Sequence, residues 1–407
     1  MDDRDFKTAA ESILASESWK QEGFRLAFRP FFYQEKGSDG LQYTHTPFSL
    51  CKEIISKLGE YAKIKRKGIR IAVLFNLEFV DVLINDFGAD CHSITFFADS
   101  EREAHAAKAW YGAGIGGIIG LKGKGIDMPK VAKKFDVVVM NPPYQAPQTI
   151  RNDKGLTGGG STLWDKFLKL ATELGDTVCS VNPSGWRTPQ HALLPVMRKG
   201  LRYLEMHSHK DGQKMFGKGT RYDIIIWDKD HHDKCLVVDE SGEKQTLDIA
   251  NWSFLPNHSL DLFGKLIAKP GEERINLLHS YSFYETRKTW MSNEQKGKFQ
   301  HPCVYMINAK NEPTYFWSSK QEEHFGVPKV IFATGCSSGF MLDVEGKYGL
   351  TQFARGVVDS PKNLPKIYET LNSERWRTVR SALFIAENSV SKDAFACLRK
   401  DFWKEFV

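Results

Sequence analysis

The sequence predicts an α/β fold in which helices cover both faces of a mostly parallel sheet. Three apolar runs, Ile69–Phe75, Ser93–Ala98 and Val137–Met140, have the pattern of strands, and segments with apolar residues at helical spacing follow the first two. Strands that alternate with helices are typical of βαβ units, in which the sheet is buried between helical layers. Ligands of such sheets bind beyond the carboxyl ends of the strands, so the candidate functional residues are those that directly follow each run.

The chain of 407 residues is too long for one ordinary hydrophobic core, which makes two domains the natural expectation. The sequence predicts a helical lead-in over residues 1–40, an α/β catalytic domain over 41–234 and a C-terminal domain over 235–407. The second boundary follows the charged run Asp228–Lys234, because the regular order of strands and helices ends there. Short strands and scattered aromatic residues beyond it predict a mixed α+β domain.

Composition excludes several classes of protein. Hydrophobic residues make up 41% of the chain, which is enough for a globular core, and the net charge of +6 suits a polyanionic partner without requiring one. The seven cysteines form no Cys-x-x-Cys pair, which argues against a zinc site or a disulfide framework and for a cytoplasmic protein. No apolar run is long enough to span a membrane, and the acidic start Met1–Asp5 does not have the pattern of a signal peptide.

The strand Val137–Met140 ends abruptly in Asn141-Pro142-Pro143-Tyr144. An amino group conjugated to a ring is a poor nucleophile, because its lone pair is delocalised. The Asn141 side-chain oxygen and the Pro142 carbonyl, held rigid by the prolines, can accept both hydrogens of such a group and favour a tetrahedral nitrogen. The Tyr144 ring offers a face on which a base can stack. This tetrad predicts methylation of a conjugated amino group, and the alternative is a proline-terminated strand followed by an ordinary loop.

Two further positions can either bind a methyl donor or serve a structural role. Thr46 is expected to cap a helix that begins at Pro47, and a helix N-terminus of this kind can receive a carboxylate. Asp99 ends the predicted strand Ser93–Ala98, where an acid can accept hydrogen bonds from ribose hydroxyls. A plain helix start and a cap for the helix after Ser100 are the respective structural alternatives.

Three other segments carry weaker signals. The glycine-rich piece Gly112–Gly125 lacks the Gly-Lys-Ser/Thr ending of a phosphate-binding loop, so we predict no nucleotide-phosphate site there. The adjacent residues His231 and His232 lie in a charged segment, which favours a solvated turn, and no metal site is predicted. Basic and aromatic residues interleave in the C-terminal part, as in Arg287–Trp290 and Arg375–Arg377. These segments suit phosphate contact and base stacking, and they suit ordinary surface and core equally.

The order of these features resembles that of the gamma-group DNA adenine-N6 methyltransferases of restriction-modification systems. The likeness covers about residues 40–230 and runs from the Thr-Pro helix start through Asn-Pro-Pro-Tyr to an aromatic loop. It implies a Rossmann-like S-adenosylmethionine-dependent methyltransferase domain and a C-terminal mixed α+β target-recognition domain. It also implies S-adenosyl-L-methionine as cofactor, double-stranded DNA as partner and a monomer or weak dimer. The implied location is the cytoplasm of a bacterial or phage-infected cell, where a cognate restriction endonuclease can accompany the protein.

The resemblance assigns the donor-binding residues one by one. Thr46 matches the position that touches the methionine part of the donor, Asp99 the acid that holds its ribose, and Asp127 the acid that contacts its adenine. The family's first cofactor strand normally ends in a glycine-containing turn, but the corresponding turn of this chain has no glycine. Side chains are therefore expected to crowd this turn and to alter or weaken donor binding. Asn76 and Glu78 are the substitutes that the segment offers.

The same resemblance assigns the residues that meet the target base. Asn141–Tyr144 match the catalytic tetrad, and Asn141 is expected to contact the donor as well. Phe216 falls where the family places a second aromatic ring against the flipped base. We expect Phe216 to open a hairpin-like unit that runs to Trp227.

The sequence thus predicts a site-specific DNA methyltransferase that transfers a methyl group from S-adenosylmethionine to N6 of a flipped adenine in double-stranded DNA. Asn141 and the Pro142 carbonyl would orient the amino group, while Tyr144 and Phe216 would hold the ring between them. Two alternatives stay open. One is a methyltransferase acting on RNA or on a protein glutamine amide, whose nitrogen is also conjugated. The other is a catalytically impaired DNA-binding relative that has lost its donor turn.

Overall fold

The computed structural model of the protein describes residues 46–122, 125–131, 134–145, 162–230, 232–279, 282–333, 339–386 and 389–406. The predicted helical lead-in lies outside these ranges. The chain forms two compact units. The first contains the described residues up to Trp186 together with Pro195–Ile249, and the second contains Arg187–Leu194 and the described residues from Ala250 onward. Every helix in the described ranges is too short or too polar to span a lipid bilayer.

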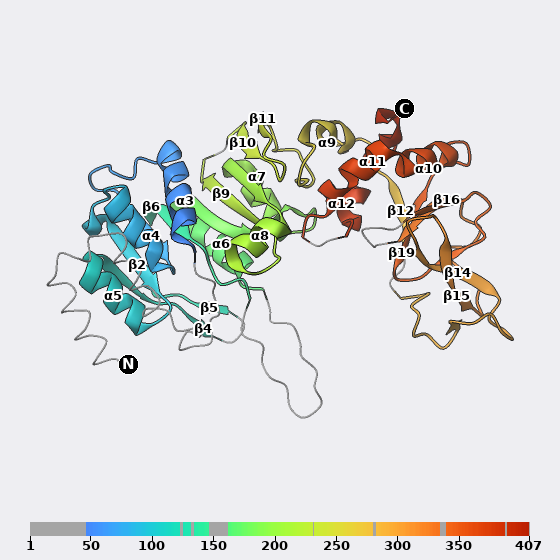
Figure 1. Cartoon of the computed structure of the whole chain (residues 1–407), viewed down its shortest axis with the longest axis horizontal. Helices are drawn as coiled ribbons and strands as arrows, with labels where there is room; N and C mark the ends of the chain where they lie inside the picture. Colours follow the sequence, from blue (N-terminus) through green and yellow to red (C-terminus); the bar gives the residue numbers. More distant parts are fainter. Residues whose placement is uncertain are drawn as a thin grey trace, which may run out of the picture. The chain divides into compact units, whose positions relative to one another are not determined.

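A β-sheet forms the centre of the first unit (Figure 1). Over the described residues it has nine strands in the order β11-β10-β8-β9-β7-β6-β1-β2-β3. β9 runs antiparallel to both of its neighbours, and β10 and β11 are antiparallel to each other. All other neighbouring strands are parallel, which confirms the predicted α/β fold with a mostly parallel sheet. The strands are β1 (Ile71–Leu74), β2 (Ile94–Ala98), β3 (Gly114–Ile118), β6 (Phe135–Met140), β7 (Gly175–Pro183), β8 (Leu201–His207), β9 (Tyr222–Asp228), β10 (Cys235–Val238) and β11 (Lys244–Leu247).

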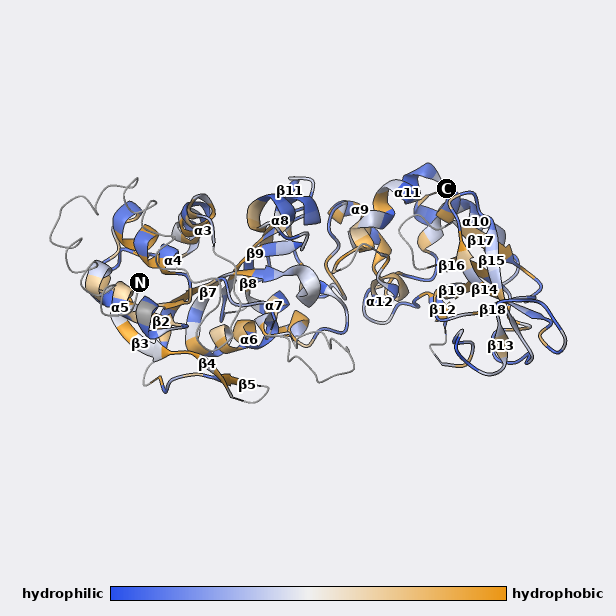
Figure 2. Ribbon diagram, turned by 60° about the horizontal axis from the view of Figure 1, so that its bottom comes forward, coloured by the Kyte–Doolittle hydropathy of each residue, from blue (hydrophilic) through white to orange (hydrophobic). Residues whose placement is uncertain are grey.

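Helices pack on both faces of this sheet. α3 (Phe48–Tyr61) carries apolar and polar residues along its length (Figure 2), and its buried residues Ile54 and Leu58 share a core with Val137 of β6. Side chains alternate along a strand, so Val138 and Met140 face the opposite side, where α6 (Trp164–Leu174) contacts β6 and β7. The remaining helices of this unit are α4 (Leu77–Asp81), α5 (Glu101–Tyr111), α7 (Leu194–Gly200) and α8 (His209–Phe216).

The order of the strands reverses at β1. The chain passes from β1 to β2 on one side, and the later strand β6 lies on the other side. Pairing of Leu74 with Phe97 and with Met140 brings the ends of the three strands level. The residues that follow these strands therefore share one edge of the sheet. A reversal of this kind is where open α/β sheets bind ligands.

The first unit extends beyond the predicted domain boundary after residue 234. β10 pairs in parallel with β8, with Leu236 opposite Tyr203, and β11 pairs with β10, so both strands continue the sheet. The charged run Asp228–Lys234 is thus the connection between β9 and β10, and the unit ends at Ile249. In this run the His232 Nε2 atom lies 3.6 Å from an Asp228 carboxylate oxygen. His231 lies outside the described residues.

The second unit contains two four-stranded sheets and several short helices in its described part. The sheet orders are β12-β19-β16-β17 and β13-β15-β14-β18. Trp376 is buried against Phe395 and Phe402, so its indole belongs to the core and is unavailable to a ligand, whereas Arg375 and Arg377 are exposed. The elements are β12 (Asn276–Leu278), β13 (Met291–Ser292), β14 (His301–Ile307), β15 (Pro313–Ser318), β16 (Lys329–Ala333), β17 (Phe340–Asp343), β18 (Gly349–Leu350), β19 (Ala354–Val358), α9 (Leu260–Leu266), α10 (Leu364–Asn372), α11 (Glu374–Val379) and α12 (Lys392–Ala396).

Candidate active site

Three predicted site residues meet in one buried hydrogen-bond network at the reversal of the sheet. The Thr46 hydroxyl lies 2.6 Å from Oδ1 of Asn76, and the Thr46 backbone N–H donates to the same oxygen at 3.2 Å. The Asn76 Nδ2 group donates to the Asn141 carbonyl at 3.0 Å, and the Asn141 Nδ2 group donates to the Thr46 hydroxyl at 2.9 Å. All three side chains are at most 3% exposed. The Thr46–Asn76–Asn141 network therefore joins the start of α3 to the ends of β1 and β6.

The network determines which way the Asn141 amide points. The backbone N–H of Thr46 needs an acceptor, so the Asn76 atom that it meets must be oxygen. The single hydroxyl proton of Thr46 goes to that oxygen, so the hydroxyl can only accept from Asn141. Asn141 must therefore present Nδ2 to Thr46. Its Oδ1 atom and the Pro142 carbonyl accept no hydrogen bond from any described residue, which leaves two rigid acceptors at the end of β6.

Thr46 does not cap α3, which corrects the prediction. The helix begins at Phe48 with Pro47 in the N-cap position, and no side chain caps its first turn. The Thr46 hydroxyl is instead committed to Asn76 and Asn141. A helix start without a side-chain cap can receive a carboxylate from a ligand.

The turn after β1 adopts the left-handed backbone that glycine usually supplies. Phe75 has φ 60° and Asn76 has φ 59°, a conformation that costs a non-glycine residue about 1 kcal/mol or more. The Phe75 ring is buried edge-on against Phe167 of α6, with 5.1 Å between ring centroids. The Asn76 amide is held in the network. Both side chains of this turn are therefore placed by specific contacts, and those contacts offset the backbone strain.

Asp99 follows β2 and is 5% exposed. The adjacent helix α5 is capped by Ser100, whose hydroxyl accepts from the Glu103 N–H at 3.3 Å, so Asp99 is not the helix cap. No hydrogen bond or ion pair to the Asp99 carboxylate is found within the described part of the chain. The Phe75 N–H donates to the Phe97 carbonyl at 2.9 Å, which ties the turn before Asn76 to the end of β2. Asp99 thus lies at the strand end next to the network, with a carboxylate that can accept from a ligand.

The other two predicted donor residues lie close to this edge without joining the network. Glu78 is in the first turn of α4 and is buried. Asp127 is exposed and ends β5 (Gly125–Asp127), which pairs with β4 (Gly120–Lys122) in a hairpin directly after β3. The Ile119 N–H donates to the Ala98 carbonyl at 2.8 Å, so this hairpin starts beside the end of β2.

One described group of side chains has the spacing of metal ligands. Asp90, Cys91 and His92 place their ligand atoms within 4.8 Å of one another. They precede β2, whereas Asn141 follows β6, so they lie at the opposite edge of the parallel sheet. They are no part of the candidate active site.

Tyr144 follows Asn141 and the two prolines in the chain, and its side-chain hydroxyl is buried. This hydroxyl has no hydrogen-bond partner among the described residues. Burial raises the pKa of the Tyr144 phenol well above its usual range, and Tyr222 and Asp223 at the start of β9 raise it further. The phenol therefore stays neutral and carries a proton that a ligand can accept.

The Phe216 ring contacts Tyr222 of β9. Its ring lies edge-on to Tyr222 with 5.1 Å between centroids, and Tyr222 stacks on His207 at 4.3 Å with the planes 7° apart. Phe216 ends helix α8 instead of opening a hairpin, which corrects that expectation, because Gly217 at φ 68° terminates the helix. The structure thus places the predicted Phe216 ring in contact with Tyr222.

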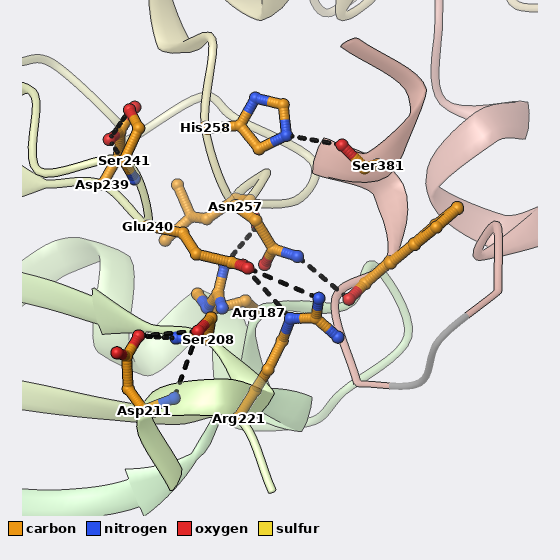
Figure 3. Close-up of polar contacts among 12 residues, drawn as sticks. Arg187, Ser208, Asp211, Arg221, Asp239, Glu240, Ser241, Asn257, His258 and Ser381 are labelled. Carbon is orange, nitrogen blue, oxygen red and sulfur yellow. Dashed lines mark hydrogen bonds and ion pairs between the residues drawn. The ribbon is translucent and has the colours of Figure 1, made fainter. Parts of the chain in front are cut away.

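Tyr222 is the aromatic residue that sequence reasoning missed, and polar contacts are made by the residues next to His207 and Tyr222 in the chain, Ser208 and Arg221. A reciprocal cap between Ser208 and Asp211 begins α8, and Arg221 forms a 3.1 Å ion pair with Glu240 (Figure 3). The signal for Tyr222 was present in the sequence, since it lies two residues before the apolar run Ile224–Trp227. Its ring lies on the same face of the sheet as the α3 core.

Sequence reasoning also missed a polar residue, Asn182. Asn182 ends β7 in an Asn-Pro dipeptide like that of Asn141, and it lies opposite Asp223 of β9. Its Nδ2 group donates to Ser180 at 2.6 Å, while Trp186 donates to the Asp223 carboxylate at 2.8 Å. These side chains are fully buried, so the ends of β7 and β9 are polar beneath the surface.

Comparisons with known proteins give no family assignment. The sequence matches no protein-family profile and no curated protein sequence. Among solved structures, the chain is similar to a protein described as a modification subunit of a type I restriction enzyme from Vibrio vulnificus YJ016. The identity is 10% and the TM-score 0.36, over 53% of this chain and 51% of that one.

Two further solved structures are similar over more of this chain. One is the type IIL restriction-modification enzyme MmeI in complex with DNA, with 9% identity and a TM-score of 0.49 over 86% of this chain and 64% of that one. The other is the type IIG restriction endonuclease BpuSI, with 11% identity and a TM-score of 0.40 over 89% of this chain and 61% of that one. The chain therefore spans about half to two thirds of the length of these proteins.

Proposed function

We propose that this protein is an S-adenosylmethionine-dependent methyltransferase that acts on N6 of an adenine flipped out of double-stranded DNA. The observation that carries the proposal is the Thr46–Asn76–Asn141 network. It orients the Asn141 amide so that neither its Oδ1 atom nor the Pro142 carbonyl accepts a hydrogen bond from a described residue. Two acceptors on consecutive residues fit a primary amino group on a ring, which has two hydrogens to donate.

The two acceptors would activate the amino nitrogen without removing a proton first. Hydrogen bonds from both N6 hydrogens to Asn141 and Pro142 draw the nitrogen out of conjugation and return its lone pair. The donor, when bound, supplies a methyl group on a sulfonium sulfur. The nitrogen lone pair forms the new bond to carbon as the carbon–sulfur bond breaks, and the extra proton on nitrogen is then lost to water.

The aromatic residues would hold the base that carries this amino group. Tyr144 lies two residues after Pro142, and Phe216 packs against Tyr222 of β9. A flipped base is commonly stacked on such rings, because it loses its neighbours in the duplex. The neutral Tyr144 phenol can also donate a hydrogen bond to a ring nitrogen.

The same edge of the sheet has the groups that a donor of this kind needs. The start of α3, which has no side-chain cap, fits its carboxylate. The buried Asp99 carboxylate, which no described residue binds, fits its ribose hydroxyls. Asp127 on the neighbouring hairpin is exposed and fits its adenine. Asn76 and Thr46 are committed to Asn141, so we assign them to positioning that residue rather than to the donor.

Product analysis tests the proposal. The protein is incubated with methyl-tritiated donor and mixed-sequence duplex DNA, and the DNA is digested to nucleosides. Label in N6-methyldeoxyadenosine is the expected result. Label in RNA or in protein glutamine in parallel reactions would favour those substrates, and the absence of both label and calorimetric donor binding would favour a DNA-binding relative.

Replacing Thr46 by valine should lower kcat about tenfold or more with little change in the KM for DNA. Valine matches the shape of threonine but leaves the buried Asn141 Nδ2 group without an acceptor, a cost of about 1–3 kcal/mol that frees the amide to rotate. Thr46→Ser keeps the hydroxyl and should restore most of the rate. A rise in donor KM at unchanged kcat would instead assign Thr46 to the donor.

A further inference from the structure

A half-buried tryptophan in the second unit carries two lysine ammonium groups on its ring. Lys320 Nζ lies 4.5 Å and Lys288 Nζ 5.7 Å from the ring centroid of Trp290. Lys320 also lies 5.7 Å from the ring of Phe283, which packs against Trp290 with 5.9 Å between centroids. We call these four residues, Phe283, Lys288, Trp290 and Lys320, the Trp290 platform. Cations held over aromatic faces are attracted by the ring electrons, which limits their movement.

The backbone around the Trp290 platform is fixed on all sides. The Trp290 indole N–H donates to the Phe283 carbonyl at 2.9 Å, and the Trp290 carbonyl accepts from the Ser319 N–H at 3.0 Å. The Lys320 N–H donates to the Ser318 hydroxyl at 3.0 Å. Phe283 packs edge-on against the buried ring of Tyr284 with 4.7 Å between centroids. The two ammonium groups are therefore carried by a rigid support.

The lysines of the Trp290 platform are not neutralised by carboxylates. Neither Lys288 nor Lys320 forms an ion pair with a described residue, although Glu322 and Glu323 follow Lys320 in the chain. Nearby basic residues behave differently, since Arg287 pairs with Glu285. Two fixed positive charges without counter-ions are an arrangement that complements a polyanion.

Trp403 provides an internal comparison within the same unit. Lys366 and Lys404 lie 5.2 Å and 5.8 Å from its ring centroid, which repeats the cation-on-ring geometry. Lys404 is bound to Asp401 at 3.1 Å, and the surrounding pocket is also lined by Glu272, Glu273 and Asp359. Lys362, Arg399 and Lys400 also line this pocket, so the Trp403 surface mixes acidic and basic residues, whereas no described carboxylate pairs with the lysines of the Trp290 platform.

We propose that the Trp290 platform binds the phosphate backbone of duplex DNA, with Lys288 and Lys320 each contacting a phosphate. The ring of Trp290 holds the two ammonium groups ready for this contact, so little side-chain entropy is lost on binding. Contacts to phosphates set the position of a protein on the duplex and carry no sequence information themselves. This inference rests on the proposed function, because it names where the second unit contacts the DNA that would be methylated.

The salt dependence of DNA binding tests the proposal. Fluorescence anisotropy with a labelled mixed-sequence duplex gives the slope of log affinity against log salt concentration for the full chain. Each of Lys288→Gln and Lys320→Gln should reduce the magnitude of that slope by about one and weaken binding equally for all sequences. Trp290→Leu should weaken binding at every salt concentration with the slope nearly kept, because both charges remain.

Lys366→Gln is the matched control, since it removes a lysine with the same ring geometry from the Trp403 surface, where acidic residues lie beside it, and its slope should equal that of the wild type. Thermal unfolding shows whether each variant is folded. An unchanged slope in folded Lys288→Gln and Lys320→Gln, or no DNA binding by the wild-type chain, would overturn the platform. If the wild type methylates DNA and the slopes are unchanged, only the platform fails. If the slopes fall but no methyl group is transferred, only the methyltransferase proposal fails.

Discussion

Replacing Asn141 by alanine should reduce methyl transfer by about 100- to 1,000-fold while DNA binding is retained. The variant removes one of the two acceptors that would draw the amino nitrogen out of conjugation, and losses of this size are typical when one preorganised polar group is removed from a reacting centre. The Pro142 carbonyl remains and can still bind one hydrogen. The rate is measured with tritiated donor under single-turnover conditions, so that product release does not mask the chemical step.

The structure indicates that Asn141→Ala can fold. Asn141 donates to Thr46, whose hydroxyl proton already goes to Asn76, so the substitution leaves no buried donor without an acceptor. The Asn141 carbonyl still accepts from Asn76, because that bond is made by the backbone. The expected loss of stability is therefore about 1 kcal/mol. Activity close to that of the wild type in the folded variant would remove the central assignment.

The sheet around Asn141 could be predicted because its signals are local. Each strand is a short apolar run buried on both faces, and Asn141-Pro142-Pro143 ends its strand for reasons of backbone geometry. The predicted domain boundary after residue 234 does not coincide with the end of the first unit, because the signal that places the next strand is not local. β10 is identified as part of the first unit only by its pairing with β8, about thirty residues earlier in the chain, and the charged turn before it has the composition of a linker.

The polar network could not be predicted, because its members are distant in sequence. The three side-chain bonds span 30, 65 and 95 residues. Locally, a threonine before Pro-Phe has the pattern of a helix cap, and only the fold directs its hydroxyl to Asn76 instead. Asp99 and Ser100 are both good caps in isolation, and the structure selects Ser100. Local patterns therefore found the strand ends but not the contacts between them.

Replacing Lys329 by methionine should destabilise the second unit by about 3–5 kcal/mol. Lys329 is fully buried at the start of β16 and faces Asp343 of β17, with 2.6 Å between Nζ and the carboxylate. Its other two protons go to the His324 and Val327 carbonyls, each at 3.0 Å. Burial lowers the pKa of Lys329, and the bond to Asp343 opposes that shift. Methionine fills the space but leaves the Asp343 charge buried without a counter-ion, the situation in which losses of this size are measured.

A double substitution separates the charge from the packing. Asp343 also accepts from the N–H groups of Lys347 and Tyr348, so it is replaced by asparagine, which keeps an acceptor and removes the charge. Lys329→Met with Asp343→Asn should recover most of the stability lost in Lys329→Met, because neither buried charge remains. Native-state hydrogen exchange of the β16 and β17 amides reports this unit by itself. If the single variant loses less than about 1 kcal/mol, the ion pair is not what holds β16 to β17. If the double variant is no more stable than the single one, lost packing rather than the unpaired charge is the cause.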